Sequence, residues 1–239
     1  GGIRGEGFYQ KDCPEHAPPW VPTFPYRSRE SGRVIRFVLC EDLATLIRLG
    51  NLACLEFHPW LSTARDPYHP DLAVIDLDPA PPAGLAEARE AAFLVREALE
   101  GRGLAGFTKL SGATGIHVYL PLGPRYTFRE VAGFVRALGR ALLRRRPDLF
   151  TLERAVERRA GRVYVDYLQN VLGKTMVGAY SPRPLPGAPV SCPVTWEELA
   201  AASPADFTLR TVPARLARLG DPCAGLAALR QRLPTTPPA

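Results

Sequence analysis

Short apolar runs, broken by turns, divide the chain into strands and helices. Arg33–Cys40 (RVIRFVLC) is rich in β-branched residues and predicts a strand, and Ala53–His58 predicts a second, shorter one. Leu72–Asp78 (LAVIDLD) is apolar almost throughout, which favours a central strand of a sheet. Four later runs also predict strands: Leu104–Leu110, Ile116–Leu122, Arg162–Asp166 and Thr175–Tyr180.

Helical spacing of apolar residues separates these strands. Asp42 can cap a helix, and Leu85–Leu99 carries apolar residues three and four positions apart. Thr127 and Glu130 form a capping-box pattern at the start of another helix. Two further helix starts are predicted at Thr195 and Ser203.

The order of elements is strand, helix, strand pair, helix, strand pair and then helices. This order predicts an α+β (mixed α/β) domain rather than a βαβ repeat. The 239 residues are enough for one large domain or two small ones, and they contain no internal repeat and no long low-complexity linker; a single domain over 1–239 is predicted. Residues 234–239 (PTTPPA) are proline-rich and are predicted to be a flexible tail.

The composition favours a polyanionic partner. The formal net charge is +6 and the pI is about 9.3, and 27 of the 30 basic residues are arginine, which suits bidentate phosphate contacts. The base composition of the genome explains the arginine bias equally well. The sequence has no apolar run of membrane-spanning length and no signal peptide, so a soluble, cytoplasmic protein is predicted. The five cysteines lack C-x-x-C spacing, which predicts reduced thiols.

Carboxylates end two of the predicted strands. Asp76 and Asp78 point to the same face of their strand, where they repel each other unless a cation lies between them. Oxygen ligands of this kind suit Mg²⁺ or Mn²⁺, although a solvated strand end is the alternative. Asp166 ends the later strand, and three carboxylates can hold two divalent ions that clamp a phosphate. An aspartate at the junction of a strand and a loop is also common.

The turn Ser111–Gly115 and the arginines after it offer groups that bind phosphate. A tight turn with two glycines presents backbone N–H groups to an anion, and His117 starts the next strand. A plain hairpin turn with a structural histidine is the alternative. Arg158, Arg159 and Arg183 flank the second acidic strand and can neutralise a triphosphate, although most surface arginines are simply solvated.

Taken together, these segments resemble the polymerase domain of bacterial ligase D, a member of the archaeo-eukaryotic primase superfamily. The matching stretches follow the expected order over almost the whole chain: GEGFYQK (5–11), RESGRVIRFVLC (29–40), LEFHPW (55–60), VIDLDP (74–79), SGATGIHVYLPL (111–122), DYLQN (166–170) and YSPRPLPGAPVS (180–191). The resemblance implies a primase-type two-module fold, in which helices flank a central mixed or antiparallel sheet.

The resemblance also implies a role for each matching residue. The implied metal ligands are Asp76, Asp78 and Asp166, with His58 as a further active-site residue. The residues implied to hold the nucleoside triphosphate are Ser111, His117, Arg159 and Arg183, with Gln169 close to the nucleotide. The implied contacts to nucleotide or DNA template are the aromatic pair Phe8 and Tyr9, with Lys11 as a further DNA contact.

The chain departs from the family pattern in three places. Thr114 stands where the family often has a lysine, and Leu185 stands where a second arginine often follows Arg183. Both changes remove phosphate-binding charge, and Lys109 is a candidate to replace it. The family's first strands and helix, with lysines that recognise a DNA 5′-phosphate, have no counterpart before Gly1, so the chain is expected to be a fragment or to lack those functions.

The sequence therefore predicts a template-dependent nucleotidyltransferase that uses two Mn²⁺ or Mg²⁺ ions and nucleoside triphosphates. The resemblance implies action at DNA ends or gaps in end-joining repair, a preference for ribonucleotides, nucleoid association, and an ATP-dependent ligase and a Ku-type end-binding protein as partners. The alternative is a catalytically reduced module that binds DNA ends and recruits such partners. A two-metal nuclease would also use the aspartates, but it leaves the triphosphate-binding residues without a purpose.

Overall fold

The computed structural model describes residues 7–28 and 31–234 of the chain. It divides into two compact units, Gly1–Leu55 and Glu56–Ala239. The ends of the matching stretches at 5–6 and 29–30, and most of the predicted tail at 235–239, lie outside the described residues. None of the helices in the described ranges combines the length and apolar character needed to cross a bilayer.

The first unit contains a two-stranded antiparallel sheet and one helix. Strands β1 (Thr23–Arg27) and β2 (Val34–Val38) pair with Thr23 opposite Val38. β2 confirms the predicted strand, whereas β1 was not predicted because Pro25 lies inside it and removes a donor. Helix α1 (Leu43–Asn51) begins where expected, because the side chain of Asp42 accepts a hydrogen bond from the backbone N–H of Thr45 (2.7 Å).

The second unit is built on a six-stranded sheet in the order β6-β7-β3-β5-β4-β8. The strands are β3 (Leu72–Pro79), β4 (Phe107–Leu110), β5 (Ile116–Pro121), β6 (Phe150–Thr151), β7 (Val163–Asp166) and β8 (Pro193–Val194). All neighbouring strands are antiparallel except β6 and β7, which are parallel. β3 lies near the middle of the sheet, as its apolar sequence predicts, and the mixed sheet with its helices confirms the α+β class.

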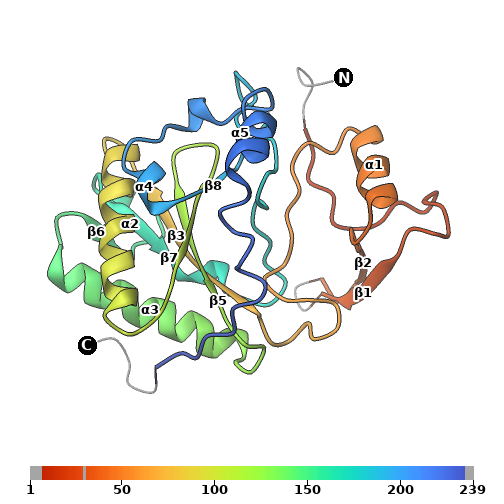
Figure 1. The fold of residues 1–239 in the computed structure, drawn as a ribbon. Coiled ribbons are helices and arrows are strands. Elements are labelled where there is room, and N and C mark those ends of the chain that lie inside the picture. Colours follow the sequence, from red (N-terminus) through yellow and green to blue (C-terminus); the bar gives the residue numbers. More distant parts are fainter. Residues whose placement is uncertain (1–6, 29–30, 235–239) are drawn as a thin grey trace. The chain divides into compact units, whose positions relative to one another are not determined.

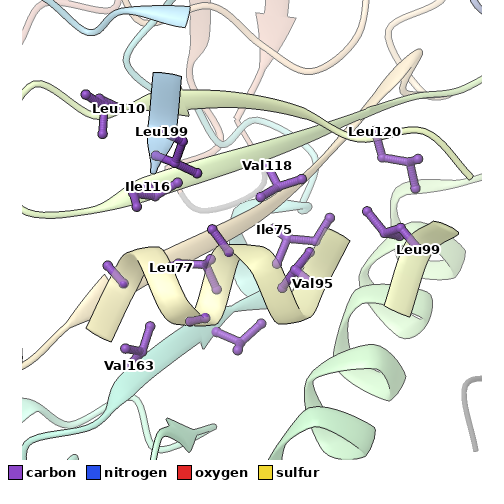
Figure 2. Close-up of a cluster of buried hydrophobic side chains, with 14 of the residues drawn as sticks. Ile75, Leu77, Val95, Leu99, Leu110, Ile116, Val118, Leu120, Val163 and Leu199 are labelled. Carbon is purple, nitrogen blue, oxygen red and sulfur yellow. The ribbon is translucent and has the colours of Figure 1, made fainter. Parts of the chain in front are cut away.

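Two long helices cover one face of this sheet (Figure 1). Helix α2 (Leu85–Glu100) contributes Val95 and Leu99 to the core, and helix α3 (Phe128–Arg145) begins at the predicted capping box of Thr127 and Glu130. Figure 2 shows α2 packed against buried side chains of β3, β5 and β7. The shorter helices α4 (Trp196–Leu199) and α5 (Val212–Leu219) follow β8, and single 3₁₀ turns include η2 (Val156–Arg158), η3 (Tyr167–Gln169) and η4 (Pro204–Asp206).

Two predicted strands, Ala53–His58 and Thr175–Tyr180, are wrong, because neither segment forms a regular strand. The two segments nevertheless meet: the N–H of Gly178 donates to the carbonyl of Phe57 (2.8 Å), and the N–H of Met176 donates to that of Pro59 (3.2 Å). Because Pro59 has no N–H to donate in return, the ladder cannot continue as a regular sheet.

Alternate residues of β3 separate the two faces of the sheet. Ala73, Ile75 and Leu77 join the core beneath the helices, and all three are fully buried. Val74 belongs to a smaller apolar cluster on the opposite face. Because side chains alternate along a strand, Asp76 and Asp78 lie on that opposite face with Val74.

Candidate active site

Four polar residues form a row across the sheet, one on each of four neighbouring strands. Asp76 on β3 is directly opposite Asp166 on β7 and directly opposite His117 on β5. His117 is in turn opposite Lys109 on β4. Directly paired residues of antiparallel strands point to the same face with their Cα atoms about 4.5–5.5 Å apart. The pairing of β3 with β7 therefore brings together two aspartates that are far apart in the sequence, with Asp78 two residues along on the same face.

Asp76 is a largely buried carboxylate, with 14% of its side chain exposed, in a crowded acidic environment. Burial, and then the charges of Asp166 and Asp78, raise its pKa, while Lys109 and a hydrogen bond from the Gln169 side chain oppose the rise, and the net pKa is about 7. Gln169 thus contacts an aspartate directly. A cation beside these carboxylates would relieve both the repulsion and the burial penalty, so the three aspartates fit divalent-ion ligands of the kind that Mg²⁺ and Mn²⁺ prefer.

The other two aspartates are held by protein donors. Asp78 Oδ2 accepts a hydrogen bond from Arg159 Nη1 (2.7 Å), and the guanidinium of Arg159 lies 4.4 Å from the ring centroid of Tyr164. Asp166 Oδ1 accepts hydrogen bonds from the Tyr164 hydroxyl (3.1 Å) and from the backbone N–H of Leu168 (3.0 Å). Within residues 7–28 and 31–234, no three His, Cys, Asp or Glu side chains are already gathered as ligands of one ion.

The Ser111–Gly115 turn is closed by its own serine and lies under Arg183. The Ser111 hydroxyl accepts hydrogen bonds from the backbone N–H groups of Ala113 (3.2 Å) and Gly115 (3.1 Å). Gly112 has a φ of +78°, and a Cβ there would lie 2.7 Å from Arg183 Cγ, so only glycine fits. Arg183 Nη1 donates to the Ser111 carbonyl (2.8 Å), which joins the two predicted phosphate-binding elements.

His117 is buried beside Asp76 with one ring nitrogen unused. Its Nε2 lies 3.5 Å from Asp76 Oδ1, while its Nδ1 is a buried polar atom without a hydrogen-bond partner among the described residues. Burial, and then the charges of Lys109 and Arg183, hold the pKa of His117 well below its ordinary value. These effects favour the neutral imidazole, and a ligand atom that hydrogen-bonds to the buried Nδ1 would satisfy a nitrogen that has no partner among the described residues.

Lys109 is fully buried rather than exposed to a cavity. Its Nζ donates to the Val177 carbonyl (2.9 Å) and to the Ser191 hydroxyl. Burial lowers its pKa, the charge of Asp76 offsets part of this, and the net pKa is about 7. In this arrangement Lys109 ties β4 to the two ends of the 177–191 segment, which carries Arg183.

Glu56 and Asn170 also belong to the site, and the sequence did not single them out. Glu56 pairs with Arg183 Nε through Oε1 and with His58 Nε2 through Oε2 (3.3 Å). The fully buried side chain of Asn170 accepts a hydrogen bond from the Val74 N–H (2.9 Å) and donates one to the Val74 carbonyl (2.7 Å). β7 ends at Asp166, opposite Asp76, so the Asn170 amide supplies the hydrogen bonds that a longer β7 would give to Val74. Both lie inside quoted motifs, LEFHPW and DYLQN, but only contacts distant in sequence reveal their roles.

Phe8, Tyr9 and Lys11 belong to the first unit. Phe8 and Tyr9 are exposed (84% and 54%), and Lys11 Nζ lies 5.8 Å from the Tyr9 ring centroid. Tyr9 and Lys11 line an open hollow of about 440 Å³ together with Ser31 and Arg33. Exposed aromatic rings beside cations are typical of surfaces that bind single-stranded nucleic acid.

Comparisons with known proteins agree in pointing to one family. A family model described as "LigD, primase-polymerase domain" matches residues 1–223. The chain is 36% identical over 223 residues to the bifunctional non-homologous end joining protein LigD of Bacillus subtilis (strain 168), covering 92% of this chain and 35% of that protein. It is 36% identical over 236 residues to the multifunctional non-homologous end joining protein LigD of Pseudomonas aeruginosa, covering 97% of this chain and 28% of that protein.

A solved structure matches as well. The polymerase domain from Mycobacterium tuberculosis Ligase D, in complex with DNA, aligns with a TM-score of 0.86 and 28% identity. The alignment covers 96% of this chain and 82% of that one. The chain spans about a third of the length of the two curated relatives above.

Proposed function

The chain belongs to the LigD primase-polymerase family, a family of nucleotidyltransferase enzymes, and on this basis we propose that it extends DNA ends or gaps during non-homologous end joining. The proposed reaction is template-dependent. The 3′-hydroxyl oxygen of a primer forms a bond to the α-phosphorus of a nucleoside triphosphate, the bond to the β-phosphate bridge breaks, and pyrophosphate and the hydroxyl proton leave.

The observation that carries this proposal is the cross-strand pair of Asp76 and Asp166 with Asp78 beside it. We propose these three residues as ligands of two Mn²⁺ or Mg²⁺ ions. When bound, such ions lower the pKa of the attacking hydroxyl and neutralise the phosphates. Gln169 hydrogen-bonds to Asp76 and would keep that carboxylate oriented toward the reacting groups. Arg159 pairs with Asp78 and would exchange this contact for a phosphate oxygen as the nucleotide binds.

The triphosphate would lie along the row toward His117 and the Ser111–Gly115 turn. The unpartnered Nδ1 of His117 and the guanidinium of Arg183 are the groups suited to its oxygens. Glu56 and His58 would hold Arg183 in place from the far side. Since Lys109 donates to two protein oxygens, its part would be to fix the Arg183 segment and add positive potential rather than to touch phosphate.

Further features of the proposal come from the family resemblance. Phe8, Tyr9 and Lys11 would contact the DNA template or nucleotide. Ribonucleotides would be preferred, and residues 1–239 would act as one catalytic domain. A ligase and a Ku-type end-binding protein would be the partners at the DNA end, in the nucleoid.

Primer extension on gapped DNA tests the proposal. Wild-type protein is expected to extend the primer only with Mn²⁺ or Mg²⁺, and comparison of ribo- with deoxyribonucleotides measures the preference. Asp76→Asn keeps the shape of the side chain and removes its charge, so extension should fall by roughly a hundredfold or more. Glu157→Gln, which changes an exposed carboxylate, is the matched control. Undiminished extension by folded Asp76→Asn protein would contradict the proposed metal site. If the wild type binds DNA but does not extend a primer, the alternative of a module that binds DNA ends and recruits partners would be favoured.

A further inference from the structure

The outer face of α3 carries a straight stripe of arginines. Five of the 18 residues of α3 are arginine and one is glutamate, so this helix holds a charge of +4 out of the chain's +6. Arg129, Arg136, Arg140 and Arg144 are all exposed, and their spacing of seven, four and four residues puts them on one side of the helix. At 1.5 Å per residue, the stripe is about 22 Å long.

The stripe lies opposite the buried face of the same helix. Val131, Val135, Leu138 and Leu142 face the core beneath the sheet. Gly133 is the remaining exposed glycine along the stripe, and a Cβ there would meet nothing within 4 Å. The arginines therefore project away from the sheet into solvent.

The stripe arginines differ from their neighbours in having no ion pairs. The nearby arginines form ion pairs, as is common on a protein surface: Arg96 pairs with Glu100, Arg145 with Glu97, and Arg146 with Glu90 and Asp148. Among the residues that the structure describes, no carboxylate lies within 4 Å of the guanidinium groups of Arg129, Arg136, Arg140 or Arg144. Arg136 instead stacks near the ring of Tyr167, 5.4 Å from its centroid.

The stripe does not help the helix to form. Arg136 and Arg140, and Arg140 and Arg144, are like charges at i and i+4, and each such pair destabilises a helix by about 0.2–0.5 kcal/mol. A helix end favours basic residues only in its last turn, where Arg144 and Arg145 stand. The spacing of Arg136 and Arg140 is thus unfavourable to the helix, the contact of Arg136 with the Tyr167 ring leaves its guanidinium charge unneutralised, and an external anion is a group that both arginines can serve.

We propose that the arginine stripe of α3, defined by Arg129, Arg136, Arg140 and Arg144, binds the phosphodiester backbone of duplex DNA. Duplex DNA carries one charge per about 1.7 Å of axis, so a 22 Å stripe faces enough phosphates to engage all four guanidinium groups. Arginine forms bidentate contacts with phosphate oxygens, and a stripe without base-reading side chains binds without regard to sequence. The choice of DNA as the anion rests on the proposed function.

This surface is separate from the carboxylate row. α3 packs through Val135 and Leu138 against the face of the sheet that Ile75 and Leu77 occupy, while Asp76 and Asp78 lie on the opposite face. The stripe would therefore hold a part of the DNA away from the primer end, and it would add affinity without touching the reacting groups. Its loss is expected to raise the DNA concentration needed for half-maximal extension and to leave the maximal rate unchanged.

Charge-matched variants test the stripe. The triple variant Arg136→Gln, Arg140→Gln, Arg144→Gln is compared with Arg96→Gln, Arg145→Gln, Arg146→Gln, which removes the same charge from ion-paired arginines nearby. Binding to a blunt 30-base-pair duplex is measured without metal or nucleotide over a range of salt. If three phosphate contacts are lost, the slope of log affinity against log salt should become less negative by about 3. The control should keep the wild-type slope. Equal slopes in the two triple variants would overturn the proposal.

Gly133 supplies a second test that cannot unfold the helix. Gly133→Glu and Gly133→Gln both replace glycine with better helix formers in open space, and they differ only in charge. Gly133→Glu should weaken duplex binding roughly three- to tenfold relative to Gly133→Gln, and the difference should vanish at high salt. Equal duplex binding by the two variants would contradict the proposal. A difference seen only with an acidic protein or an anionic vesicle would mean that the stripe binds an anion other than DNA, and would also contradict it.

The stripe and the proposed function fail in different ways. If the nucleotidyltransferase proposal is wrong, the wild type fails to extend a primer whatever happens at α3. If the stripe proposal is wrong, the stripe variants bind and extend at wild-type DNA concentrations, while Asp76→Asn still abolishes extension.

Discussion

The two faces of the six-stranded sheet are made from alternating residues of the same strands, yet one face buries apolar side chains and the other buries a row of ionisable ones. The face under α2 and α3 is an apolar core in which Ile75 and Leu77 are fully buried (Figure 2). The other face carries Asp76, His117 and Lys109 side by side; His117 and Lys109 are buried, and Asp76 is largely buried. One face is stabilised by packing, and the other holds groups whose burial is unfavourable.

The pKa directions on the polar face show what this burial does. Burial raises the pKa of Asp76 to about 7, lowers that of Lys109 to about 7, and lowers that of His117 well below its ordinary value. All three groups are thus pushed toward their neutral forms, as desolvation requires. A row of this kind persists because the apolar face supplies the stability, and perturbed groups gathered in this way are typical of functional sites. Changes on the two faces should therefore separate stability from activity.

The largest expected effect is on the apolar face. Leu99 is fully buried at the end of α2, and Leu99→Ala leaves a cavity, so the free energy of unfolding should fall by about 2–5 kcal/mol. The rate of primer extension per folded molecule should stay within about threefold of the wild type, because Leu99 and the polar row belong to opposite faces of the sheet. Denaturant unfolding and extension well below the melting temperature measure the two quantities. A large loss of rate with full folding would mean that the faces are coupled.

The next effect concerns the arginine that anchors the Ser111–Gly115 turn. Arg183→Ala should weaken nucleotide binding by about 1.5–3 kcal/mol, or roughly ten- to a hundredfold, because a charge-assisted contact is lost. Leu185 leaves no second arginine nearby in the sequence to share the load. Nucleotide titration of single-turnover extension measures the affinity, with Arg210→Ala, an exposed arginine, as the control. Unchanged affinity and rate would show that the triphosphate binds elsewhere.

A smaller effect is expected from Asn170, which holds the acidic strands together. Asn170→Leu leaves the N–H and carbonyl of Val74 without partners, so stability should fall by about 1–3 kcal/mol. Because Val74 is two residues from Asp76, the carboxylate pair should also be less well ordered, and Mn²⁺ affinity should fall roughly tenfold. Calorimetric titration with Mn²⁺ measures this directly.

The conservative change Asn170→Asp separates a positioning role from simple destabilisation. It keeps an acceptor for the Val74 N–H and loses the donor to the carbonyl, so it should retain more of the Mn²⁺ affinity than the leucine variant. Leu99→Ala provides a protein of similar or lower stability with an intact Val74 contact. Equal Mn²⁺ affinity in Asn170→Leu and the wild type would leave Asn170 with a structural role alone.

The elements of the fold that could be predicted from sequence are the long, periodic ones. α2, α3, β3 and β5 lie where the apolar spacing and the Thr127 capping box put them. β1 was missed because Pro25 disguises an edge strand. The segments 53–58 and 175–180 were assigned as strands because their composition is strand-like, but they share only isolated backbone hydrogen bonds, and Pro59 has no N–H to extend them.

The candidate site was predictable in its residue types but not in its contacts. That Asp166 stands opposite Asp76 depends on β7 pairing with β3, which no local pattern encodes. The Arg159–Asp78 pair, the Glu56–Arg183 pair and the buried position of Lys109 likewise depend on how distant segments pack. Sequence therefore identified the chemistry, and tertiary pairing decided which groups face one another.

The smallest expected effect is a dependence of stability on pH that the polar face alone should cause. In the folded, metal-free protein the pKa of Asp76 is about 7, against an ordinary value of 3.8, so the folded state holds this proton more tightly than the unfolded state does. The resulting stabilisation is complete below pH 4 and is lost as the pH rises to about 7. Asp76→Asn cannot lose it, so the variant should be more stable than the wild type at pH 8, and the difference should shrink toward pH 4. Thermal melting in the presence of a chelator, at several pH values, measures this difference in stability.

Adding Mn²⁺ should reverse the order of the two stabilities at pH 8, because only the wild type retains all three carboxylates to bind the ion and be stabilised by it. A variant less stable than the wild type at pH 8 without metal would show that Asp76 is held by favourable contacts, and the contrast between the two faces would then be lost.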